Sequence, residues 1–153
     1  MKWLFWMLLF LSFLLINEIT VEWLLAVVVG GYAPQPGFER ATQYFTVHSF
    51  LFSASFRVIP YIVLSAVAVV LFSSLKKSSI GKIALYCSLA AISLFHFWGY
   101  WDMQHSHFTS EHTSSTSALA IIFIPIHAIW LSAVVGVLGY GLAKITRLVL
   151  NRA

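Results

Sequence analysis

Five ionisable side chains lie within long apolar stretches of this sequence, where water is scarce: Glu18, Glu22, Arg57, His96 and His127. An arginine at the centre of a membrane helix costs ~2.5 to 3.5 kcal/mol on insertion scales, so such residues usually face a bundle interior and find partners. We therefore expect the five to form a buried polar cluster in which Arg57 pairs with Glu18 or Glu22. Such a cluster is suited to proton transfer or to holding helices in register.

Their spacing favours a shared interior. Glu18 and Glu22 are four residues apart, which places both side chains on one face of a helix. Counted at about 1.5 Å per helical residue, all five side chains fall in the same half of the membrane, next to the weakly charged connectors. Pro60 and Pro125 lie close to Arg57 and His127, and prolines in membrane helices often border cavities.

A second group of ligand-type residues follows the third apolar stretch, in WDMQHSHFTSEHTSST at residues 101–116. Imidazole nitrogen suits zinc and copper, and a carboxylate often adds a further ligand. The candidate metal or haem ligands in and around this stretch are His48, His96, His105, His107, Glu111, His112 and His127. No spacing among them matches a defined signature, since HSH followed by EH is not HExxH. We favour a solvated hairpin over a metal site, a partner-binding loop or a pH-sensitive histidine cluster.

The composition requires lipid around most of the chain. Of 153 residues, 60% are hydrophobic and only 9% are charged, whereas soluble domains carry roughly 25% charged residues. The net charge of +4 comes from basic residues scattered beside apolar segments, which indicates membrane orientation and not nucleic-acid binding. Cys87 is the only cysteine, which excludes an intramolecular disulfide and a cysteine-based zinc site.

Four stretches are long and apolar enough to cross a bilayer as helices, at about 3–30, 46–75, 80–101 and 117–143. They are continuous and not alternating, which excludes barrel strands. We predict an all-α polytopic membrane protein, with one four-helix transmembrane domain over residues 1–153. The first stretch would measure ~42 Å as a straight helix, so it must tilt, project outward or break near Asn17. It is too long for a signal peptide, and we expect it to be retained.

Basic residues separate the two sides of the membrane. Seven of the nine fall at the N-terminus, the connector at 76–82 and the C-terminus: Lys2, Lys76, Lys77, Lys82, Lys144, Arg147 and Arg152. The connectors at 31–45 and 102–116 contain a single basic residue, Arg40. The positive-inside rule then predicts that both termini are cytoplasmic and that these two connectors face outward, into the periplasm of a bacterial inner-membrane protein.

Three functions remain. No nucleophile elbow, phosphate-binding loop or nucleic-acid motif appears, so a non-enzymatic accessory, assembly or immunity-type subunit is favoured, bound to a membrane-protein partner or to itself. The first alternative is a redox protein that holds haem b or a divalent transition metal with His96, His127 and His48. The second is an oligomeric proton-coupled transporter that uses Glu18 or Glu22.

Overall fold

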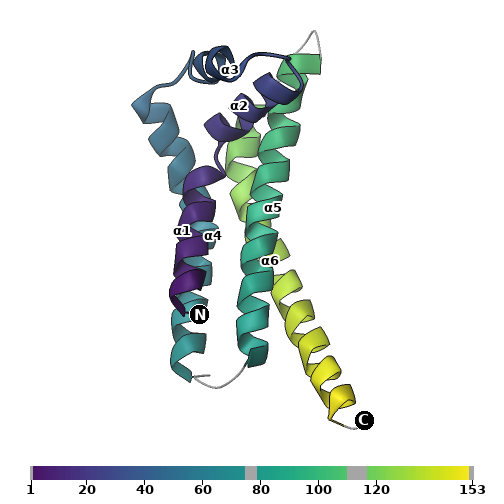
Figure 1. Cartoon of the computed structure of the whole chain (residues 1–153). Coiled ribbons are helices and arrows are strands. Elements are labelled where there is room, and N and C mark those ends of the chain that lie inside the picture. The colour runs from purple at the N-terminus through teal and green to yellow at the C-terminus, as the bar shows by residue number, and fades with distance from the viewer. Residues whose placement is uncertain (1, 75–78, 110–116, 152–153) are drawn as a thin grey trace.

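The computed structural model describes residues 2–74, 79–109 and 117–151. Within these ranges the chain forms six helices and no strand (Figure 1). The helices are α1 (Lys2–Leu15), α2 (Glu18–Val28), α3 (Pro34–Ala41), α4 (Val47–Ser74), α5 (Ser79–Thr109) and α6 (Ser117–Leu150). The prediction of an all-α fold is confirmed.

Three helices have membrane-spanning length and hydropathy, over Val47–Phe72, Ile80–Thr109 and Leu119–Leu150. The bent pair of α1 and α2 raises the number to four if it counts as one span. Large apolar side chains cover the outside of the bundle, including Leu94 on α5 and Trp130 on α6, which are 70% and 73% exposed. Such a surface is stable only against an apolar solvent. The chain is therefore a helical protein of the multi-pass membrane class.

Two apolar clusters hold the helices together. In the first, Phe5 of α1 packs with Tyr61 of α4 and Ile92 of α5. In the second, Leu25 of α2 packs with Tyr100 of α5 and with the beginning of α6. The first helix pair thus contacts the bundle at two levels, α1 beside α4 and α5, and α2 beside the far part of α5.

Small residues bring α5 and α6 into close contact. Gly136 of α6 lies directly against the hydroxyl of Ser88, and Gly139 lies against Cys87. The Ser88 hydroxyl also donates a hydrogen bond to the carbonyl oxygen of Ser132, at 2.9 Å. Close backbone approach of this kind is the usual way for helices to associate in lipid, where burial of apolar surface gives little advantage.

The first apolar stretch breaks at Asn17. The axes of α1 and α2 differ by 65°. The side-chain oxygen of Asn17 accepts hydrogen bonds from the backbone N–H groups of Ile19 and Thr20, and its amide donates to the Leu14 carbonyl oxygen. Asparagine is a preferred N-cap because it satisfies N–H groups that have no partner within the helix. Of the three ways to accommodate this stretch, the break is the one that occurs.

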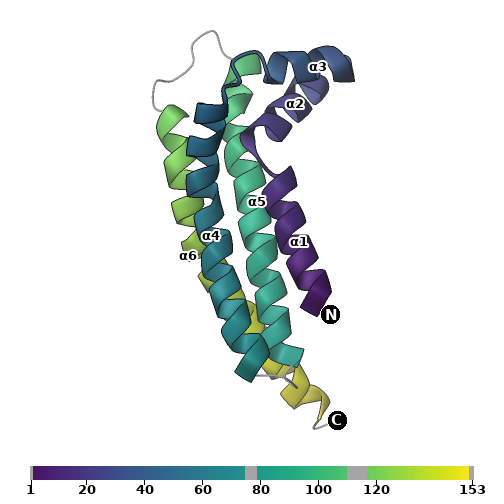
Figure 2. The same cartoon turned by 90° about the vertical axis from the view of Figure 1, so that its left-hand side faces the viewer.

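The break turns α2 and α3 across one end of the bundle, which we call the α3 end (Figures 1 and 2). Gly31, with φ of 69°, allows the tight turn between the two helices. Pro34 begins α3, and its carbonyl oxygen accepts a hydrogen bond from the Trp23 indole N–H. Both termini lie toward the opposite end (Figure 1).

Two boundaries differ from those expected. Helix α5 continues to Thr109 and not to residue 101, so His105 and His107 are helical and not part of a hairpin. Helix α6 continues to Leu150, beyond the expected 143. The apolar length of a stretch indicates where a span leaves lipid, but it does not limit the helix. The added turns of α5 find a tertiary contact, because the Gln104 amide donates a hydrogen bond to the Glu18 backbone carbonyl oxygen. The added turns of α6 are exposed, and nothing in the structure explains them. Glu111 and His112 lie outside the described residues.

Candidate functional site

A buried ion pair joins α4 to the break in the first helix pair. Nη1 of Arg57 lies 2.6 Å from Oε2 of Glu18, and the two side chains are 2% and 15% exposed. The guanidinium carbon lies 5.2 Å from the ring centre of Phe13 and 5.5 Å from that of Phe50. Arg57 therefore contacts α1 and α2 at once, with its charge balanced by a carboxylate and two aromatic faces.

Helix α5 supports the acid of this pair. The Gln104 side-chain amide donates a hydrogen bond to the backbone carbonyl oxygen of Glu18, at 3.0 Å. Asn17 immediately before it is fixed by its capping bonds. Glu18 is thus held through its backbone by α5 and through its carboxylate by α4, which determines where α2 begins.

His96 and two tyrosines lie beside the pair. His96 is fully buried, and its Nδ1–H donates to the Ile92 carbonyl oxygen at 2.9 Å, so Nε2 is the free ring nitrogen. The rings of Tyr61 and Tyr100 are centred 5.7 Å and 5.9 Å from that of His96. The imidazole is therefore packed between two aromatic rings, one from α4 and one from its own helix.

Several buried polar atoms around the pair make no hydrogen bond within the described residues. They are Arg57 Nε, Ser53 Oγ, Tyr61 OH, His96 Nε2, Tyr100 OH and Gln104 Oε1. Most buried polar groups in proteins are paired with protein, ordered water or a ligand. This concentration of unpaired groups at one place marks it as the candidate functional site.

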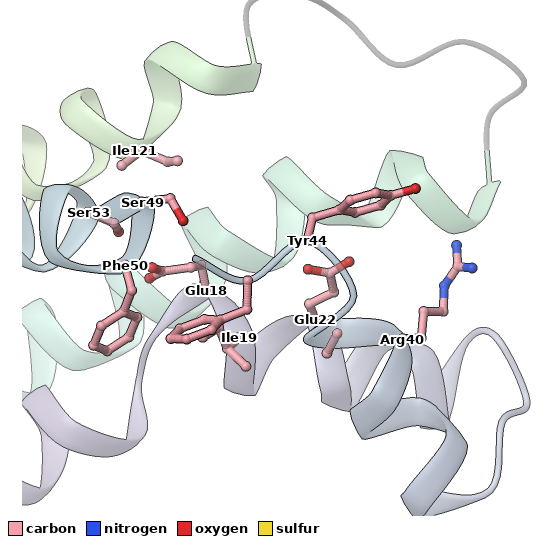
Figure 3. Close-up of a pocket in the computed structure, with 11 residues that line it drawn as sticks. Glu18, Ile19, Glu22, Arg40, Tyr44, Ser49, Phe50, Ser53 and Ile121 are labelled. Carbon is pink, nitrogen blue, oxygen red and sulfur yellow. The ribbon is translucent and has the colours of Figure 1, made fainter. Parts of the chain in front are cut away.

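A cavity of about 190 Å³ opens beside Glu18, the acidic member of the ion pair (Figure 3). It is bounded by α2, the end of α3 and the segment that follows it, the first turns of α4 and the beginning of α6. Its charged lining residues are Glu18, Glu22 and Arg40, and its hydroxyl-bearing ones are Tyr44, Ser49 and Ser53. The Glu18 carboxylate thus belongs both to the buried pair and to the cavity.

The predicted polar cluster is only partly assembled. Glu18, Arg57 and His96 lie together, and Glu22 lines the cavity without an ion pair to Arg57. The inclusion of His127 was wrong: it is exposed, and its Nδ1–H donates to the Phe123 carbonyl oxygen. The reason is helix rotation. Ala128 faces the bundle, and the preceding residue lies about 100° around the helix.

The candidate metal ligands that the structure describes do not converge. His48 is exposed in the first turn of α4, and His105 and His107 lie two residues apart on α5, about 200° around the helix, so they cannot chelate one ion together. No three His, Cys, Asp or Glu side chains are arranged to hold a metal anywhere in the described ranges. The proposed haem ligands divide into one buried residue, His96, and the exposed His48 and His127.

Tyr61 and Gln104 were missed as members of the site. Helical spacing could have indicated both, because residues four apart lie on one face of a helix: Tyr61 is four residues after Arg57, and Gln104 is four residues after Tyr100. Gln104 was assigned to a loop because the third apolar stretch was expected to end at residue 101. The role of Arg40 in the cavity depends on the fold of α3 over α2, and no local pattern indicates it.

Comparison with known proteins adds no identity. No protein-family model matches the chain, and no curated protein or solved structure matches it. The fold and the site define the class stated above, a multi-pass helical membrane protein with a buried Arg–Glu pair next to a polar cavity.

Proposed function

We propose that the protein is a four-span bacterial inner-membrane protein that acts as a non-enzymatic accessory, assembly or immunity-type subunit. The observation that supports this most directly is the position of the buried ion pair. Glu18 and Arg57 join the break in the first span to α4, and this contact holds α2 and α3 across the end of the bundle. The buried charges of Glu18 and Arg57 thus hold α2 and α3 in place as a preformed surface at the α3 end.

That surface is rich in aromatic side chains. Tyr32, Phe38, Tyr44 and Phe45, which follow α2 or lie in and after α3, are between 40% and 86% exposed. Aromatic residues and arginine are enriched where proteins contact each other, and a rigid surface loses little entropy on binding. A membrane-protein partner that contacts the α3 end is the occupant that this chemistry favours.

The charge distribution supports the orientation. Both termini lie toward the end opposite α3 (Figure 1), and Lys2, Lys144 and Arg147 belong to these terminal segments. The positive-inside rule places that end in the cytoplasm and the α3 end outside.

Thiol labelling tests the orientation. In a Cys87→Ser background, Glu39→Cys on α3 should react with a membrane-impermeant maleimide in cells with a permeabilised outer membrane. Asn151→Cys should react only after the inner membrane is opened. Both positions are exposed, so access depends on the side of the membrane. Labelling of Asn151→Cys in intact cells would reject cytoplasmic termini.

Affinity purification in mild detergent tests the function. A single membrane partner should be recovered at near-stoichiometric yield, and Tyr44→Ala should lower that yield at least severalfold. Trp130→Ala is the matched control, because this aromatic is also largely exposed, at 73% against 86% for Tyr44, but lies on α6, outside the proposed surface. Recovery of the protein only as a homo-oligomer, or equal loss with both variants, would count against the accessory role.

A second candidate is a proton-coupled transporter, favoured by one specific observation. Broken helices often line substrate sites in transporters, and here the first residue after the break, Glu18, lines a cavity. In reconstituted vesicles, Glu18→Gln should then abolish proton-driven solute movement while Glu39→Gln leaves it unchanged. Unchanged movement with Glu18→Gln rejects this alternative.

A further inference from the structure

The cavity beside the ion pair has opposite charges at two places. The carboxylates of Glu18 and Glu22 extend into the same space, and the Arg40 guanidinium lies beyond Glu22 (Figure 3). Arg40 is oriented by the rings of Tyr32 and Phe108, at 5.5 Å and 5.0 Å. Within the described ranges neither Glu22 nor Arg40 forms an ion pair. With Arg57 neutralising Glu18, the remaining charges of the site are one negative and one positive.

A buried hydroxyl in the cavity wall also lacks a partner. Ser53 is 2% exposed, lines the cavity, and makes no hydrogen bond of good geometry within the described chain, although the Tyr100 hydroxyl is close to it. Oε2 of Glu18 is occupied by Arg57, which leaves its second oxygen as an acceptor. The inner end of the cavity therefore offers hydrogen-bond acceptors that the protein itself does not use.

The walls suit an organic cation of small size. Tyr44, Phe45 and Phe50 line the cavity, and aromatic faces attract ammonium groups. Its volume of about 190 Å³ suits a small ligand such as a lipid headgroup fragment or a small amino acid.

The inner end of the cavity, at Glu18, lies below the headgroup region. Helix α1 rises about 21 Å from its first residue to its last. Glu18 then lies roughly 9 Å inside the outer boundary of a ~30 Å hydrocarbon core. This depth depends on the four-span orientation proposed above, whereas the charges and volume of the cavity do not.

We propose that this cavity binds a zwitterion, with its ammonium group between Glu18, Glu22 and Ser53 and its anionic group on Arg40. Two sources present this chemistry: the phosphoethanolamine headgroup of an outer-leaflet lipid, and a free amino acid. The ligand site goes beyond the accessory function and does not require it.

Native mass spectrometry of the purified full-length protein provides the test. The probes are phosphatidylethanolamine, phosphatidylglycerol, soluble phosphoethanolamine and glycine, each titrated into the detergent-solubilised chain. Phosphatidylethanolamine should be retained in preference to phosphatidylglycerol. Glu22→Gln and Arg40→Gln should each weaken its apparent Kd about tenfold, as expected for the loss of one charge-assisted contact.

Glu39→Gln is the matched control, since it removes the same charge from an exposed position on α3 outside the cavity. Glu22→Gln alone keeps the test decisive if Arg40→Gln disturbs the stacking on Phe108. Selective retention of phosphatidylethanolamine assigns the lipid source, and binding of glycine or phosphoethanolamine assigns a free ligand. Equal retention of both lipids without binding of either soluble probe overturns the proposal, as does equal affinity of Glu22→Gln and Glu39→Gln. Partner recovery with Glu22→Gln is measured separately, so failure of the ligand site leaves the accessory role intact.

Discussion

Glu18 and Arg57 should contribute unequally to stability when each is replaced alone. Glu18→Gln leaves a charged guanidinium that is 2% exposed, with only an amide dipole as its partner. Arg57→Met removes the costly charge and leaves a carboxylate that faces a polar cavity. We therefore expect Glu18→Gln to be the more destabilising change, although it is the more conservative one chemically.

The separation of 2.6 Å between Nη1 and Oε2 sets the magnitude. At an effective dielectric constant near 20, two unit charges at that distance attract by about 6 kcal/mol. The glutamine amide restores roughly 2 kcal/mol through a hydrogen bond to the charged group. The expected cost of Glu18→Gln is thus about 4 kcal/mol, within the range of about 3 to 5 kcal/mol for breaking a buried pair. Arg57→Met should cost only about 1 to 2 kcal/mol, as an ordinary core substitution does.

Reversible unfolding in mixed micelles with increasing SDS, followed by circular dichroism, measures these free energies. The double variant should resemble Arg57→Met, which corresponds to a coupling energy of about 4 kcal/mol between the two sites. Glu22→Gln is the control on the same face of α2, without an ion pair to Arg57, and should change stability by less than about 1 kcal/mol. The reasoning is refuted if Glu18→Gln costs no more than Glu22→Gln, or if Arg57→Met proves the worse of the two single variants.

Two further predictions concern the helices that position the site. Gly136→Ala should lower the free energy of unfolding by about 1 to 3 kcal/mol, because the new Cβ would collide with the Ser88 hydroxyl. The control is Gly141→Ala, since no neighbouring atom lies within 4 Å of the new Cβ there. It should be neutral or slightly stabilising in the same SDS titration. Asn17→Ala should cost about 1 kcal/mol through loss of the two N-cap bonds. Asn17→Ser, which keeps an uncharged acceptor oxygen, should preserve most of the stability; equal losses for the two Asn17 variants would show that the cap does not hold the bend.

Local chemistry explains what was predictable in the fold. Polar groups without partners are costly in lipid, so a chain in lipid must form long apolar helices. The number and approximate positions of these helices follow from apolar runs of about 20 residues in the sequence. Asn17 interrupts such a run with a side chain suited to cap a new helix, so a break there was among the alternatives. The pairing of Arg57 with an acid near the break followed from charge, but its choice of Glu18 over Glu22 did not.

By itself the sequence determined that most of this chain must face lipid and that Arg57 needs an acidic partner, because transfer free energy belongs to each side chain wherever it is placed. Only the tertiary structure decided that Glu18 is that partner, that His127 faces away from the bundle, and that Arg40 shares a cavity with Glu22. The rotation of each helix about its axis and the 65° bend between α1 and α2 result from packing between segments far apart in the chain. A rotation of about 100° per residue is enough to move a side chain from the interior to the surface.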